Sequence, residues 1–129
     1  MIKTCSIYNF RNETNYDVAY AIVRSMSKPI IGAQQLKCLS PDYNLFKTYL
    51  NLRDKGLWNK ESFEKLYKPY FIQQIENDKL AQRVLEELAE QSKTKNILLL
   101  CYCKDKDLCH RSLIGNMLRE KYDANVIIR

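Results

Sequence analysis

Asn96-Ile97-Leu98-Leu99-Leu100-Cys101-Tyr102-Cys103 is the stretch that decides the fold of this chain. Its residues 97–102 read as a strand in which residues 97–100 are apolar on both faces. Such strands usually lie at the centre of a parallel sheet that helices cover on both sides. A helix pattern over residues 109–122 and a short strand over residues 125–128 follow. Together these segments have the length of a strand–helix–strand crossover.

We therefore predict one α/β domain over residues 1–129, with three layers, a mostly parallel central sheet flanked by helices, and a Rossmann-like architecture. Residues 2–9 alternate and are rich in β-formers, and residues 17–25 favour a strand that ends near Arg24. Helices are expected where apolar residues recur at helical spacing after a capping residue. The first would start at Ser40-Pro41 and stop at Gly56. The second would start at Asn59 and break at Pro69, and the third would span residues 78–92.

Composition limits the partners and the cellular location that can be expected for this protein. The 129 residues carry a formal charge of +6, which permits contact with nucleic acid but equally fits an ordinary solvated surface. No apolar run is long enough for a bilayer, and the N-terminus lacks the apolar core of a signal peptide, so we expect no membrane partner and a cytoplasmic location. In that reducing setting, five cysteines suggest buried thiols, metal ligands or a nucleophile.

The turn over residues 101–111 gathers most of the reactive side chains, including three of the five cysteines and the only histidine. Ligands of open α/β sheets usually bind beyond the carboxyl ends of the strands. A helix that starts near Cys109 would offer free amides to an anion, and Arg111 would add a planar fork. The sequence predicts an anionic ligand here, either a nucleotide or a nucleic-acid phosphate. Its expected ligand-binding residues are Arg24, Tyr102, Cys103, Arg111 and Ser112.

Catalysis at the same turn is a further hypothesis. Cys109 would be the nucleophile, because a helix start and two neighbouring cations favour its thiolate. His110 would transfer a proton, and Asp105 or Asp107 could act as acid or base. The spacing from cysteine to arginine differs from that of the cysteine phosphatase loop, so a protein phosphatase is not expected.

Two other interpretations stay open. Cys101, Cys103, Cys109 and His110 supply the four ligands of a structural zinc, in a non-catalytic interaction module, although their spacing is awkward for it. Alternatively, the cysteines are small apolar core residues, and the charged side chains only tie the loop to nearby carbonyls. Tyrosines could likewise stack on bases or merely pack at the core rim, namely Tyr8, Tyr16, Tyr20 and Tyr43.

The Leu-Leu-Leu-Cys strand at residues 98–101 and Cys109-His110-Arg111 after it resemble the signature of domain of unknown function 488. Looser similarities are the strand at residues 21–25, the turn at residues 39–41, and the aromatic series Trp58, Phe63, Tyr67 and Tyr70. The resemblance implies an α/β fold and no settled activity. That group often has an acidic residue where this chain has Cys103, so Asp105 or Asp107 would have to replace it in any general-acid role.

Overall fold

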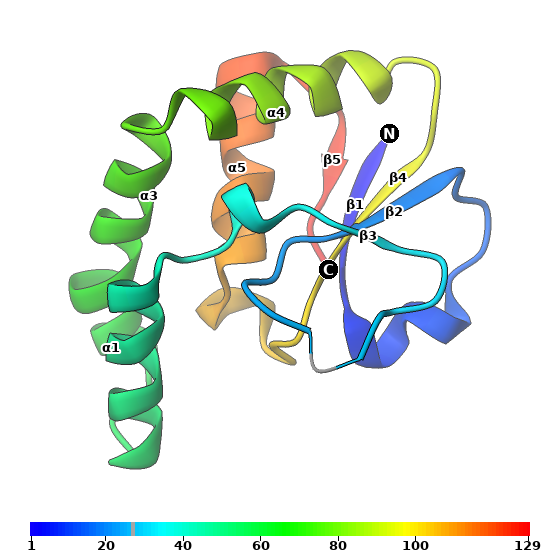
Figure 1. Ribbon diagram of the computed structural model, residues 1–129. Helices are drawn as coiled ribbons and strands as arrows, with labels where there is room; N and C mark the ends of the chain where they lie inside the picture. The colour runs from blue at the N-terminus through cyan, green and yellow to red at the C-terminus, as the bar shows by residue number, and fades with distance from the viewer. Residues whose placement is uncertain (27) are drawn as a thin grey trace.

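The computed structural model describes residues 1–26 and 28–129 and is built on a parallel sheet (Figure 1). Its five strands lie in the order β3-β2-β4-β1-β5, and every pair of neighbours is parallel. The central position of β4 confirms the prediction from its continuous apolar sequence. The strands are β1 (Ile2–Ser6), β2 (Val18–Ala21), β3 (Gln34–Gln35), β4 (Ile97–Cys101) and β5 (Val126–Ile127).

The helices follow the predicted segments with shifted ends. Asn59 caps the second helical segment through a reciprocal pair of bonds with Ser62, and Pro69 lies in the first turn of a new helix, as the expected break requires. Among the described residues, no helix is both long and apolar enough to cross a membrane. The helices are α1 (Tyr43–Asp54), α2 (Lys60–Ser62), a π-helical turn (Phe63–Tyr67), α3 (Lys68–Glu76), α4 (Lys79–Gln91) and α5 (His110–Tyr122).

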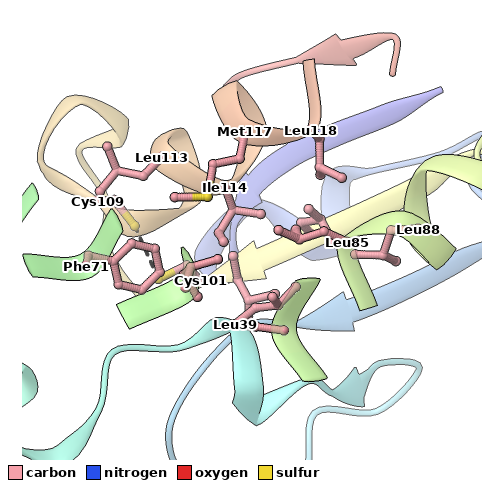
Figure 2. Close-up of a cluster of buried hydrophobic side chains, with 14 of the residues drawn as sticks. Leu39, Phe71, Leu85, Leu88, Cys101, Cys109, Leu113, Ile114, Met117 and Leu118 are labelled. Carbon is pink, nitrogen blue, oxygen red and sulfur yellow. Dashed lines mark hydrogen bonds between the residues drawn. The ribbon is translucent and has the colours of Figure 1, made fainter. Parts of the chain in front are cut away.

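Alternation along β4 divides the apolar core between the two faces of the sheet. Ile97, Leu99 and Cys101 join the large cluster under the helices (Figure 2). Leu98 and Leu100 join a smaller cluster, which is completed by side chains from the 3₁₀ helix Ile7–Asn12 and its neighbours. The sheet is thus covered on both faces, which confirms the predicted three-layer α/β fold. The same alternation along β4 points the Cys101 side chain toward the helices.

Several predicted boundaries were wrong, including the end of the second strand at Ala21 instead of near Arg24, and one strand was missed. The first strand ends at Ser6, because the Ser6 side chain accepts from Tyr8 N and starts the 3₁₀ helix. Asp42, and not Ser40, caps α1: its carboxylate accepts from Leu45 N at 2.8 Å, whereas the Ser40 hydroxyl donates to a carbonyl of the preceding turn. Strand β3 was not predicted, since two glutamines carry no apolar alternation.

Candidate functional site

A cavity of about 420 Å³ opens beyond the carboxyl end of β4. The loop after β2, helix α1 and the π-helical turn surround it. Its walls combine aromatic rings, two arginines and the first residues of the turn after β4. The lining includes Tyr8, Arg24, Phe46, Tyr49, Arg53, Trp58, Tyr67, Cys101, Tyr102, Cys103 and His110. The expected position of a ligand site in an open parallel sheet is therefore hollow.

Three thiols meet beside this cavity, and two of them, Cys101 and Cys103, line it. Cys101 ends β4, Cys103 follows in the irregular loop, and Cys109 is the N-cap of α5. Their Sγ atoms all lie within 4.8 Å of one another, and Cys109 Sγ lies 3.3 Å from Cys101 Sγ. Figure 2 shows Cys101 and Cys109 turned toward each other beside Phe71. Three such close cysteines could hold a metal ion.

His110 is buried against this cluster in a defined orientation. Its Nε2 lies 2.6 Å from the Ile22 carbonyl oxygen, which can only accept, so Nε2 carries the proton. In the neutral ring the unprotonated Nδ1 then faces the sulfurs, 3.6 Å from Cys101 Sγ and 3.9 Å from Cys109 Sγ. Burial disfavours the charged ring, but the Cys109 thiol and the bond to Ile22 outweigh it and raise the pKa of His110. The imidazole therefore connects β2 to the thiol cluster.

The cluster favours one thiolate over the other two. The nearby Cys101 and Cys109 thiols, with smaller contributions from the charges of His110 and Arg111, lower the pKa of Cys103. The proximity of Cys103 in turn raises the pKa of Cys101, and burial raises that of Cys109. Cys103 is also the one of the three that is only half-buried. The reactive thiol expected from this arrangement is therefore Cys103.

Arg111 is a structural residue of the turn, and its side chain is 1% exposed. Its guanidinium donates from Nη1 to the Cys103 carbonyl at 2.6 Å and from Nη2 to the Lys104 carbonyl at 3.4 Å. A third bond joins Nε to the Arg129 carbonyl at 3.0 Å. This residue borders a polar hollow beside β1 rather than the cavity with the thiols. Its fork holds the loop backbone, because each of its three nitrogens donates to a backbone carbonyl.

Two other arginines supply the positive charge of the cavity. The Arg24 guanidinium lies over the Tyr43 ring, 5.5 Å from its centroid, and that of Arg53 lies over the Tyr49 ring at 5.7 Å. Such stacking holds a cation in place. Arg53 also donates from Nε and Nη2 to the exposed Asp54 carboxylate at 3.4 and 3.3 Å, so a ligand would compete with that pair. Arg24 was expected at this mouth from the sequence. Arg53 was not, because it comes from a helix whose placement over the sheet cannot be read from spacing.

Aromatic rings form the wall opposite the thiols. Trp58 lies edge-on to Tyr49 and Tyr67, with centroids 4.8 and 5.4 Å apart. Burial raises the pKa of Tyr67 well above its usual value, so this phenol stays protonated. Periodicity marked Tyr67 only as an inward-facing core residue. The concentration of aromatic residues between positions 58 and 67 was the available signal for a site.

The remaining predicted site residues lie away from the cavity. Asp105 and Asp107 are exposed, and the Asp105 carboxylate caps the following 3₁₀ turn by accepting from Asp107 N at 2.9 Å. The Ser112 hydroxyl donates to the Lys106 carbonyl. Cys109, the expected nucleophile, is 1% exposed. Of the predicted set, the structure brings Arg24, Cys101, Tyr102, Cys103 and His110 together around the cavity.

Comparison with known families agrees with this architecture. Residues 2–122 match the family model of the active DUF488-N3 subclade. The chain belongs to the DUF488 family. No curated protein and no solved structure matches it significantly. The resemblance seen in the Cys-His-Arg signature is thereby confirmed, and the activity of this DUF488 protein has to be inferred from its own site.

Proposed function

We propose that this protein binds an anionic ligand with an aromatic ring, namely a nucleotide or one nucleotide unit of a nucleic acid, and uses Cys103 as a nucleophile on it. The observation that carries this proposal is the shared cavity: a half-buried thiol of lowered pKa, two arginines and several aromatic rings border the same hollow. A phosphate would bind Arg24 and Arg53, and a base would stack on the aromatic wall.

The chemistry of the turn supports Cys103 over Cys109 as the nucleophile. The Cys103 thiolate can attack the phosphorus of a bound phosphate ester without a preceding proton transfer: an S–P bond forms, the P–O ester bond breaks, and the alcohol leaves with a proton from solvent. His110 does not move that proton in this proposal, because its Nε2–H is bound to Ile22 O; it positions the cluster. The family model describes its subclade as active, which favours catalysis. Reliance on free thiols favours a cytoplasmic location.

Ligand binding can be tested with the single tryptophan of the chain as a probe, because Trp58 lines the cavity. We expect nucleoside 5′-monophosphates to change its fluorescence saturably, and inorganic phosphate or an uncharged nucleoside to bind at least about tenfold more weakly. The Arg24→Ala, Arg53→Ala double variant should lose at least about tenfold in affinity. Lys65→Ala is the matched control, since Lys65 forms an exposed pair with Glu61 on the outside of the protein.

Equal binding of the nucleotide to the double variant and to the wild type would rule out this cavity as the nucleotide site. Covalent turnover is tested separately. Cys103→Ser should retain nucleotide binding and lose any thiol adduct with the ligand, as detected by mass spectrometry. Retention of the adduct in Cys103→Ser would assign the nucleophile to another residue.

The three-thiol geometry favours a second candidate function, a zinc-bound and non-catalytic interaction module. Thiolates that share a tetrahedral zinc lie about 3.8 Å apart, and the three Sγ atoms lie within 4.8 Å of one another. The Nδ1 atom of His110 contacts two of these thiols, and its Nε2–H bond to a carbonyl is typical of a metal-bound histidine. Stoichiometric zinc in protein purified without added metal, lost in Cys109→Ser, would favour this candidate; metal-free folded protein would exclude it.

A further inference from the structure

The cluster of thiols beside the cavity is larger than a single nucleophile requires. Cys101 and Cys109 are buried, whereas Cys103 borders the cavity and is half-buried. All three Sγ atoms lie within 4.8 Å of one another. Cys103 belongs to the irregular loop of residues 102–105 between β4 and the 3₁₀ turn Lys106–Leu108, so its backbone is not held by the sheet. An accessible thiol with hidden thiols in reach is the arrangement that lets a first oxidation product be resolved as a disulfide.

We propose that a hydroperoxide oxidises Cys103 and that Cys109 resolves the product as a reversible Cys103–Cys109 disulfide. In the first step, the Cys103 thiolate attacks one peroxide oxygen, the O–O bond breaks, and Cys103 sulfenic acid and hydroxide form. In the second step, Cys109 Sγ attacks Cys103 Sγ, the S–O bond breaks, and water leaves with the proton of the Cys109 thiol. Two thiols have then lost two electrons to one peroxide, and a small dithiol can restore them by exchange.

The position of each cysteine decides their roles. Cys103 meets the oxidant first because it lines the cavity and is the least buried of the three thiols. A Cys101–Cys103 bridge would span only one intervening residue and strain the disulfide geometry. Cys109 approaches from the separate start of α5 and closes a longer loop. Closing the sulfurs to bonding distance then requires movement of the loop and leaves β4 in place.

The inference goes beyond the proposed function, since it concerns oxidation of the site rather than its ligand. Its consequence is reversible loss of the Cys103 nucleophile under peroxide stress, with protection against irreversible over-oxidation. Cys5 and Cys38 are not part of this chemistry. Cys5 lies on the opposite face of the sheet, where its thiol donates to the Ser6 carbonyl, and Cys38 packs at the edge of the main core.

The test treats chelator-stripped full-length protein with one equivalent of hydrogen peroxide and follows thiols and masses. We expect the titratable thiols of the denatured wild type to fall from five to three, with a loss of two hydrogens and a mapped Cys103–Cys109 peptide. Dithiothreitol should restore both thiols. With one equivalent, Cys109→Ser should stop at the sulfenic acid of Cys103, and with excess peroxide it should accumulate the sulfinic or sulfonic acid, whereas Cys101→Ser should still form the disulfide. Cys38→Ser is the control and should behave as wild type.

Several outcomes would overturn the proposal. Accumulation of over-oxidised Cys103 in the wild type to the same extent as in Cys109→Ser would show that Cys109 does not resolve it. The rate of thiol loss should decrease at least about tenfold in Cys103→Ser. An unchanged rate would show that another thiol reacts first. A disulfide between two protein molecules in place of the internal one would equally exclude it. None of these measurements needs the nucleotide, so they leave the proposed function to its own test.

Discussion

The two halves of the turn after β4 differ in what their side chains do. In the first half, Cys103 borders the cavity with a favoured thiolate. In the second half, Cys109 and His110 are buried, and Arg111 donates to three backbone carbonyls. The more conspicuous Cys-His-Arg tripeptide therefore builds the turn, and the less conspicuous cysteine borders the cavity. A strong sequence signature can mark the frame of a site rather than its reacting group.

Replacing Arg111 tests the structural half of this comparison and should give the largest effect. Arg111→Met leaves the Cys103, Lys104 and Arg129 carbonyls without their donor, so we expect the free energy of unfolding to fall by about 3 kcal/mol or more. Urea denaturation measures it. The control, Arg53→Ala, removes an exposed arginine paired with Asp54 and should cost below about 0.5 kcal/mol.

Should Arg111→Met not fold, Arg111→Lys answers the same question. Lysine keeps the charge but cannot make three bonds in the geometry of the fork, so a clear intermediate loss is expected. Wild-type stability of Arg111→Lys would mean that charge alone holds the loop, and the contrast between the two halves of the turn would weaken.

The pH dependence of Cys103 alkylation tests the reactive half and should give the next largest effect. Iodoacetamide reacts with the thiolate, so the rate follows the thiolate fraction. For a thiol of ordinary pKa that fraction rises on the order of 80-fold between pH 6 and pH 8. Because the pKa of Cys103 is lowered, its thiolate is already formed at pH 6, and its rate should change by less than about twofold. Peptide mapping distinguishes the alkylation rate of Cys103 from that of Cys38, whose pKa is raised by burial.

A rate at Cys103 that climbs with pH as steeply as that at Cys38 would contradict the favoured thiolate. The Cys101→Ala variant sharpens the result. It removes the thiol that contributes most to lowering the pKa of Cys103 and puts no donor in its place, so the pH midpoint of alkylation should move upward. An unchanged midpoint in this variant would assign the shift to the charges of His110 and Arg111 instead.

The fold was largely predictable because it follows from local pattern. Continuous apolar sequence placed β4 at the sheet centre, and Asn59 and Pro69 marked real helix boundaries. The start of α1 was wrong by two residues because Ser40 and Asp42 are both acceptable caps and only the path of the chain chooses between them. Likewise β3 forms by pairing with β2 and not by its own pattern.

The site was only partly predictable because the direction in which a side chain points depends on how the helices pack on the sheet. The sequence located the thiols and Arg24 at one edge of the sheet, and they meet there. It could not reveal that Cys109 becomes the buried N-cap of α5, or that Arg111 turns toward Arg129. Both follow from how α5 docks on β1 and β4. Spacing along the chain predicts which face a residue lies on, but not which of two adjacent hollows its side chain enters.

Asp105 gives the smallest expected effect and tests the loop between the two halves. Its carboxylate accepts from Asp107 N, so Asp105→Ala should lower the free energy of unfolding by about 1 kcal/mol, as loss of a cap does. Asp107→Ala is the matched control and should stay within about 0.5 kcal/mol. Neither carboxylate borders the cavity, so alkylation of Cys103 at pH 6 should change less than about twofold in both variants. A large loss of Cys103 reactivity in Asp107→Ala, at wild-type stability, would instead support the acid–base role that the sequence suggested for Asp107.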